Sequence, residues 1–251
     1  MYDFTTLDIA ALVWFGIAWL GFGLLVDISG LAGPSLSRLM DDQRHAWMEV
    51  LRRREVRIVD TAIMTSLQNG TAFFASASLI ALGGAFTLLN QTDRMIQIFQ
   101  DLPLHPAATR GMLEMKIVGL VGIYGYAFFK FGWSYRLFNY AAILIGAVPT
   151  PGSADEATIE AAAARAGAMQ IDAGHHFHRG LRAMFFSVGF FGWFVDARVF
   201  LVATTLVLGV LLRRQFLSRA RAAVAGARPP VFLDHSVQGA GQKLDDRPTS
   251  L

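Results

Sequence analysis

The chain contains no cysteine among its 251 residues. Disulfide bonds, thiolate metal sites and cysteine nucleophiles are therefore excluded. Charged residues are also scarce, at 16% against about a quarter in an average globular protein. Glycine-rich phosphate loops, paired catalytic carboxylates and serine-centred nucleophile motifs are missing from the sequence as well. We therefore predict that the protein is not an enzyme and needs no metal or other cofactor.

What the chain has instead is long stretches without charge. Hydrophobic residues make up 54% of it, including 20 Phe and 5 Trp. The stretch from Leu7 to Val26 contains a single charged residue, Asp8 at its start, and at about 1.5 Å per residue it matches a hydrocarbon core of about 30 Å. Further apolar stretches begin near Leu67, Met112 and Ala183. The sequence therefore predicts an all-α, polytopic transmembrane helical bundle.

The second and third predicted spans show how the helices could pack. The second runs from about Leu67 to Leu89, and the third from about Met112 to Phe129, with the helical pattern continuing to Ala147. One face of the second span is built of small residues, which let helix backbones approach closely inside a membrane. We therefore expect a tightly packed neighbour there. The small residues are Gly70, Ala77, Ala81, Gly84 and Ala85, with Ser76 and Ser78 beside them.

The apolar stretch from Ala183 to Leu212 is too long for one perpendicular crossing and contains Asp196 and Arg198. It could be one tilted helix, giving four spans, or a hairpin of two short spans, giving five. Lysine and arginine accumulate in cytoplasmic loops, and the hairpin places nearly all of them on one side. The exceptions are Arg94, Arg110, Arg198 and Lys116. We expect five spans, with the N-terminus outside and the C-terminus inside.

The polar segments between the spans predict the remaining elements. Asp27 to Asp60 predicts a basic, amphipathic helix on the cytoplasmic membrane surface, and Asn90 to Arg110 a loop with at most a short helix. Asp155 to Ile171 predicts another helix. Residues 1–217 would form the membrane domain and 218–251 a disordered cytoplasmic tail. Because the cations adjoin hydrophobic stretches, we expect anionic lipid head groups as partners and no nucleic acid.

Three histidines form the densest group of potential metal or haem ligands. They are His175, His176 and His178, and neutral imidazole binds Zn, Cu and haem iron. Only His175 and His178 have the three-residue spacing that places side chains on one helix face. These two are weak candidates for a cofactor site. A solvated cluster beside Arg179 and Arg182 is the favoured interpretation.

Several ionisable residues lie within or near predicted spans, where a charge is a functional candidate by default. Glu114 and Lys116 occupy the first turns of the third span, where an interfacial carboxylate and a lysine reaching toward the head groups are favoured over an ion relay. Asp196 and Arg198 would be wetted at the tip of a hairpin. In one continuous helix they would instead form a buried pair, which would favour transport.

Polar side chains also occur near the cytoplasmic ends of spans two and three. Gln68 and Asn69 could meet Arg136 and Asn139 in a network that holds the helices together. The arginine run from 52 to 57 is interleaved with acidic residues. It could therefore form ion pairs within the helix or bind lipid phosphate.

Several local patterns occur in a fixed order between about Leu12 and Ser218. They are Arg44-His45-Ala46-Trp47-Met48 with Arg54 and Asp60, Phe73-Phe74-Ala75-Ser76, Phe129-Lys130-Phe131-Gly132-Trp133-Ser134-Tyr135-Arg136, Asn139-Tyr140, Leu144-Ile145-Gly146-Ala147-Val148-Pro149, Gly180-Leu181-Arg182-Ala183, Trp193-Phe194, and Arg213-Arg214-Gln215-Phe216-Leu217-Ser218. This ordered set resembles the bacterial and plant membrane proteins grouped as DUF599, a domain of unknown function. The resemblance implies a polytopic membrane protein and supplies no activity, substrate or catalytic residue. Family members often have proline near the position of Asp196, which supports a helix break there. They also tend to have asparagine near His178, so a histidine function would be peculiar to this chain.

We therefore expect a non-catalytic accessory or interaction subunit of the bacterial cytoplasmic membrane. Its small-residue faces would pack against its own helices, a second copy or a partner membrane protein. The alternative is a small-solute or ion transporter acting as an oligomer. Its candidate residues are Glu114, Lys116, Asp196 and Arg198.

Overall fold

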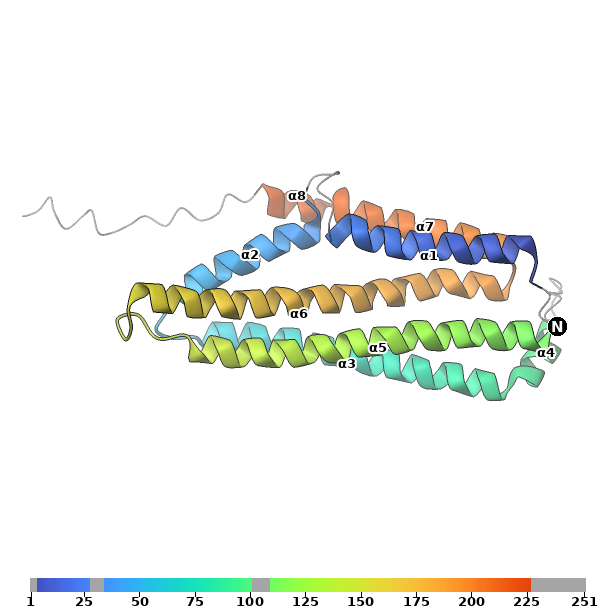
Figure 1. Ribbon diagram of the computed structural model, residues 1–251, viewed down its shortest axis with the longest axis horizontal. Helices are drawn as coiled ribbons and strands as arrows, with labels where there is room; N and C mark the ends of the chain where they lie inside the picture. The colour runs from blue at the N-terminus through green and yellow to red at the C-terminus, as the bar shows by residue number, and fades with distance from the viewer. Residues whose placement is uncertain (1–3, 28–33, 101–108, 227–251) are drawn as a thin grey trace, which may run out of the picture.

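The computed structural model describes residues 4–27, 34–100 and 109–226, in which the regular elements are all helices (Figure 1). The prediction of an all-α protein is therefore confirmed. A short 3₁₀ turn, Gly192–Phe194, separates α6 from α7. The α-helices are α1 (Thr6–Asp27), α2 (Leu36–Leu51), α3 (Ile58–Asn90), α4 (Thr92–Gln100), α5 (Arg110–Ala147), α6 (Glu156–Phe191), α7 (Ala197–Phe216) and α8 (Arg219–Ala225).

Four regions among the described residues are long and apolar enough to cross a membrane: α1, α3, α5 and the stretch from α7 into α8. The helix α6 lies between α5 and the pair α1 and α7, so the chain runs along the bundle five times (Figure 1). The start of α1, α4 and the α6–α7 link lie at one end, which we call the hairpin end. The helices α2 and α8 lie toward the other, which we call the α2 end (Figure 1).

The break predicted at Asp196 is present. The side chain of Asp196 accepts a hydrogen bond of 2.7 Å from the backbone N–H of Arg198 and thereby caps the start of α7. At Gly192 a Cβ atom would lie 3.0 Å from both the Cα atom of Phe200 and the carbonyl oxygen of Val199. This close approach of the two backbones lets α7 fold back along α6, so Ala183 to Leu212 forms a helical hairpin.

The helix α6 is continuous from Glu156 to Phe191, although the sequence suggested a separate polar helix before the apolar stretch. It contacts α1, α2, α5 and α7. A Cβ atom at Gly180 would lie 2.7 Å from the ring of Phe131, so the small residue lets α5 pack closely. Because its neighbours shield it, α6 does not need the uniformly apolar composition of a lipid-facing span.

Two hydrophobic cores lie along the bundle. The first, toward the hairpin end, includes Phe15, Phe186 and Trp193. The second, toward the α2 end, includes Leu51 of α2 and Phe138 of α5. The 38 residues of α5 extend about 57 Å, nearly twice a hydrocarbon core of about 30 Å. We call the part built around the second core the extension: α2, the link from α2 to α3, the start of α3, the second half of α5 and the first half of α6.

The expected close neighbour of α3 is α5. The buried positions Thr71, Ser78 and Ala85 recur every seven residues and face α5. In contrast, Gly70 and Gly84 are exposed, with open space where a Cβ atom would be. Part of the small-residue surface of α3 therefore packs against α5, and the rest is exposed.

Two polar segments differ from expectation. The helix α2 packs along α6, and its Met48 and Leu51 are buried in the second core, so its apolar face is covered by protein instead of lipid. The segment predicted to be a disordered tail begins with α8, which Ser218 caps by accepting a hydrogen bond from Arg221 N–H. The rest of that tail, 227–251, lies outside the described residues. The segment from Asn90 to Arg110, expected to contain at most a short helix, contains α4.

Candidate functional site

At the hairpin end, Lys116 is held inside the bundle and does not reach toward the head groups as expected. Its Nζ donates a hydrogen bond of 2.6 Å to the backbone oxygen of Trp193 and lies 5.3 Å from the centre of the Trp193 ring. The indole N–H of Trp193 in turn donates to Asp8 at 2.8 Å. Asp8 also accepts from Thr5. Lys116 and Asp8 are both buried, so this cluster ties α1, α5 and the α6–α7 link together.

The other three transport candidates lie near the surface of the same end. Glu114 accepts a hydrogen bond of 2.8 Å from Arg110, one helical turn earlier. Asp196 and Arg198 are exposed at the tip of the hairpin, as predicted for five passes. The structure therefore brings only Lys116 of the four into a buried cluster.

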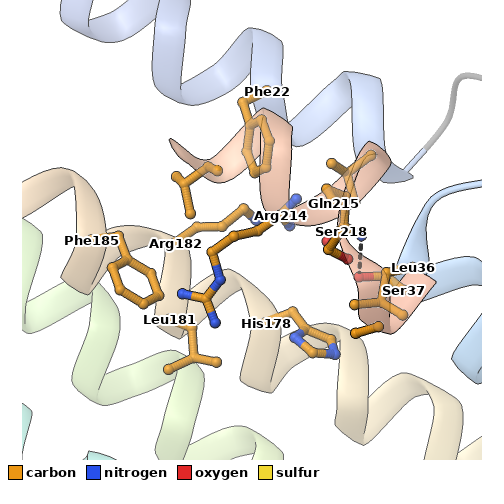
Figure 2. A pocket seen from close by; sticks show the side chains of 13 residues that line it. Phe22, Leu36, Ser37, His178, Leu181, Arg182, Phe185, Arg214, Gln215 and Ser218 are labelled. Carbon is orange, nitrogen blue, oxygen red and sulfur yellow. Dashed lines mark hydrogen bonds between the residues drawn. The ribbon is translucent and has the colours of Figure 1, made fainter. Parts of the chain in front are cut away.

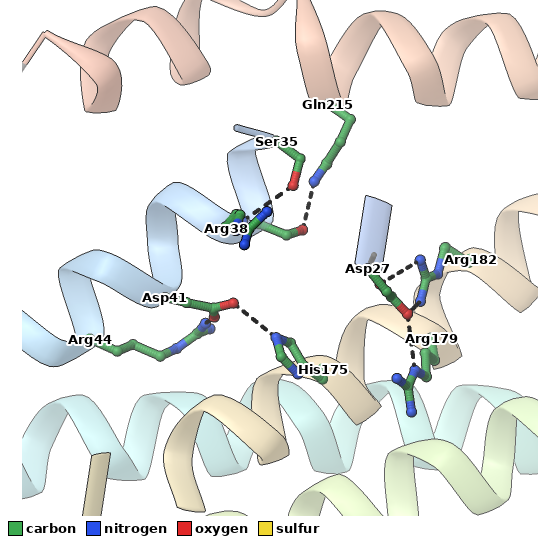
Figure 3. A network of polar contacts seen from close by, with 10 residues as sticks. Asp27, Ser35, Arg38, Asp41, Arg44, His175, Arg179, Arg182 and Gln215 are labelled. Carbon is green, nitrogen blue, oxygen red and sulfur yellow. Dashed lines mark hydrogen bonds and ion pairs between the residues drawn. The ribbon is translucent and has the colours of Figure 1, made fainter. Parts of the chain in front are cut away.

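Toward the α2 end, Asp27 joins the end of α1 to the middle of α6 (Figure 3). Arg182 donates two hydrogen bonds to its carboxylate, at 3.1 and 3.0 Å, and Arg179 donates a third at 3.3 Å. The paired bonds from one guanidinium fix the direction of the side chain as well as adding energy. Two arginines share one carboxylate, so the region keeps an excess of positive charge.

A second polar group joins α2 to α6 (Figure 3). The ring of His175 lies 2.8 Å from a carboxylate oxygen of Asp41, which also accepts from Arg44 at 2.6 Å. The hydrogen bond that the ring donates to the Asp41 carboxylate raises the pKa of His175. Burial lowers the pKa of His178 to about 4, and the positive charges of Arg44 and Arg182 add to this effect.

The two histidines do not share a ligand site. His175 is bound to Asp41, whereas His178 lines a cavity between α6 and the ends of α1 and α7. Within the described ranges, no group of three or more His, Cys, Asp or Glu side chains is placed to hold a metal ion.

The polar network predicted between α3 and α5 consists of one bond. Gln68 donates to Asn139 at 2.8 Å. Asn69 is exposed on the outer side of α3, because consecutive helix positions diverge by about 100°. Arg136 donates to Tyr140 one turn later on its own helix and stacks on Trp133.

The arginine run after α2 is committed to contacts within the protein. Arg52 pairs with Glu49 at 2.7 Å and also with Glu156, the first residue of α6. Arg54 pairs at 3.0 Å with Asp60, whose side chain is fully buried. Ion pairing, one of the two expectations for this run, is therefore present.

Arg57 has a different structural role. Its guanidinium donates three hydrogen bonds to backbone carbonyls at the end of α5, where the last turn of a helix leaves acceptors without partners. This interaction fixes the start of α3 against the end of α5. The acceptors are Ile145, Val148 and Pro149, at 3.1, 2.5 and 2.9 Å.

Sequence reasoning missed most acidic partners in these groups. Asp8 and Asp27 begin and end the first span, and Asp41 lies in the basic amphipathic helix. The position of Asp8 and Asp27 at the ends of an apolar span indicated that they could be functional. No local pattern specified which distant residues these carboxylates and Asp41 would contact. The aqueous ends of an apolar helix are the places where charges cost least.

The protein is a bundle of long apolar helices, with one polar cluster around Lys116 at the hairpin end and another around Asp27 toward the α2 end. This arrangement defines a multi-pass helical membrane protein. The chain belongs to the family described as "Protein of unknown function, DUF599", whose family model matches residues 10–220. The match confirms the resemblance expected from the ordered sequence patterns. No curated protein and no solved structure matches the chain.

Proposed function

We propose that the protein is a non-catalytic subunit of the bacterial cytoplasmic membrane that assembles with a second copy of itself. Basic residues of α2 and of the link to α3, such as Arg38 and Arg53, lie toward the α2 end. Lysine and arginine favour the cytoplasmic side of a membrane, which supports an extension that projects into the cytoplasm. The hairpin end, with Asp196, would then face outward.

The observation that carries the proposal is an exposed apolar surface on the extension. We call it the extension patch, and it comprises Val56, Ile58, Val59, Ile63 and Ile143. Their exposed fractions are 68, 74, 60, 40 and 67%. Apolar surface that faces water in a folded protein is typical of an interface with another protein.

The same face of the bundle continues into the membrane. Arg57 brings the start of α3 against the end of α5, so the members of the patch lie at one end of one helix pair. Further along α3, the exposed Gly70 and Gly84 leave room for a partner helix. A second chain could therefore contact both the extension patch and α3 within the membrane.

The absence of charge on α3 favours a second copy as the occupant. No charged residue occurs from Thr61 to Asn90, so two identical α3 faces can meet without repulsion between like charges. Two-fold symmetry, the commonest arrangement of homo-oligomers, brings a surface against itself in this way. The buried ionisable groups also form structural contacts within the chain, which supports a role without chemistry.

The proposal can be tested by disulfide crosslinking, because the natural chain has no cysteine. We expect Ile63→Cys, and separately Val59→Cys, to form a dimer when membranes are oxidised. Met40→Cys serves as the matched control. The exposed fraction of Met40 (38%) is similar to that of Ile63, and Met40 lies on α2, away from the extension patch. Crosslinking requires Cα atoms about 4.4–6.8 Å apart, so a dimer reports close contact.

The opposite result would be equally clear. If neither variant crosslinks more than Met40→Cys, and the purified protein has the mass of one chain in mild detergent, the second copy is excluded as the occupant.

Transport stays the alternative, and one observation favours it. Lys116 and Asp8 are both buried near one another, and buried charges in membrane helices often mark ion pathways. Their hydrogen bonds to Trp193 account for the same burial structurally. The lysine substitution described below separates the two interpretations.

A further inference from the structure

A cavity of about 270 Å³ lies where α1 and α7 end against α6 (Figure 2). Its apolar wall includes Phe22 of α1, Phe185 of α6 and Leu211 of α7. Its polar side includes Ser37 of α2 and Arg214 near the end of α7. The cavity is thus apolar toward the membrane-spanning part of the bundle and polar toward the extension. This is the arrangement that an amphiphilic molecule requires.

The cavity contains one cation without a matching carboxylate. Arg182 also lines the cavity, but two hydrogen bonds commit its guanidinium to Asp27, and Arg179, which shares that carboxylate, does not line the cavity. The guanidinium of Arg214 lies 5.4 Å from the centre of the Phe185 ring, and no carboxylate in the described part of the chain pairs with it (Figure 2). Because burial lowers the pKa of His178 to about 4, this ring is neutral at physiological pH and adds no further charge.

The start of α2 adds hydrogen-bond donors at the same place. Leu36 and Ser37, in its first turn, line the cavity. Ser35 caps the helix by accepting from Arg38 N–H at 3.3 Å. Within the described residues the N–H groups of Leu36 and Ser37 have no acceptor, and such groups at a helix start favour anions. Gln215 donates to the Ser37 hydroxyl at 2.7 Å and holds this turn against α7.

We propose that this cavity binds the phosphate head group of a monoanionic phospholipid. Arg214 and the first turn of α2 contact the phosphate, while the acyl chains leave along Phe22 and Phe185 into the bilayer. The ligand carries one negative charge because the cavity offers one unbalanced cation. The site lies away from the extension patch and does not depend on dimer formation.

The test uses the full-length protein in a neutral detergent, with thermal unfolding as the readout, since a ligand that binds the folded state raises the melting temperature. The probes are short-chain phosphatidylglycerol, short-chain phosphatidylcholine and inorganic phosphate. We expect a saturable rise in melting temperature with phosphatidylglycerol and little change with the other two. Phosphate alone lacks the apolar contacts, and phosphatidylcholine has no net charge.

Two substitutions locate the binding. Arg214→Gln should weaken the apparent affinity for phosphatidylglycerol about tenfold, as expected for loss of one charge-assisted contact. Arg213→Gln is the matched control, because it removes the same charge from the exposed neighbouring position that does not line the cavity. Leu181→Trp, which fills the cavity while keeping both arginines, should also abolish the response.

Three results would overturn the proposal. An equal loss in Arg213→Gln would indicate general attraction to surface charge. An equal response to phosphatidylcholine would exclude an anionic site. A response to inorganic phosphate at the same concentrations would indicate a soluble anion instead of a lipid.

Discussion

Lys116 shows how this protein accommodates a charge on a helix that crosses the membrane. An ammonium group in hydrocarbon is costly unless it is paired or hydrogen-bonded. The Trp193 carbonyl, the Trp193 ring and the nearby Asp8 provide that compensation from two other parts of the chain. The side chain therefore links helices, and its removal would leave polar groups buried without partners.

We expect Lys116→Met to lower the free energy of unfolding by about 1–3 kcal/mol, the usual cost of leaving a buried polar group without its partner. The measurement is the melting temperature in detergent. Lys130→Met is the control, since Lys130 is only half-buried and its Nζ lies 5.3 Å from the centre of the Tyr126 ring. A Lys116→Met protein with unchanged stability but reduced solute flux in reconstituted vesicles would favour transport.

At the scale of elements, α2 is attached to the bundle by a small number of polar contacts at its start and middle. Ser37 binds Gln215 of α7, and Asp41 binds His175 of α6. Beyond these contacts its last turn is buried in the second core through Met48 and Leu51. The middle contact depends on pH because histidine is one of its two partners.

The Asp41–His175 contact should weaken as pH rises. The hydrogen bond to Asp41 raises the pKa of His175, so the folded state favours the charged ring. Its stabilising contribution is complete below the ordinary histidine pKa of about 6.5 and is lost as pH increases through the raised pKa. We expect Asp41→Asn to lower the melting temperature more at about pH 6 than at about pH 8.5.

The control for this measurement is Asp42→Asn, a change at the adjacent exposed position. The other charged groups around His175 are Asp27 and Arg179, with Arg44 paired to Asp41, and Asp42→Asn keeps all of them. The pKa of His178, about 4, lies well below this range. The same pH profile for both variants would contradict the role of the Asp41–His175 contact.

The elements that local sequence could predict are those with local signals. Asp196 marked the break before α7, and the helical pattern of the third span ended at Ala147, where α5 ends. The path of α2 could not be predicted, because an amphipathic helix fits a membrane surface and a protein surface equally well. The cluster around Lys116 was also missed. Its hydrogen bonds join residues 77 and 185 positions apart, and no local pattern encodes such a pairing.

At the scale of the whole molecule, the five passes along the bundle place the start of α1 and the end of α7 toward opposite ends. The chain enters α1 at the hairpin end and leaves α7 toward the α2 end (Figure 1). In the proposed orientation, the basic residues grouped toward the α2 end face the cytoplasm. Exposed residues lie at both ends of the bundle, so labelling them can measure which side of the membrane each end faces.

We expect Arg198→Cys, at the hairpin end, to react with a membrane-impermeant maleimide in intact cells. Ser153→Cys, in the exposed turn between α5 and α6, should react only after the membrane is opened. The natural chain, which has no cysteine, is the unlabelled control. Labelling of both positions from the same side would contradict five passes, and reversed labelling would contradict the orientation.

The hairpin between α6 and α7 also constrains how the chain enters the membrane during synthesis. As a separate segment α6 does not have the length of apolar sequence that the other four crossing regions have. Only the residues from Gly192 to Asp196 connect it to α7, whose sequence is apolar enough to insert. Insertion machinery that releases segments into lipid by their hydrophobicity would therefore release α6 late, together with α7. The final two passes would enter the bilayer as one unit, after the helices that later shield α6 are already there.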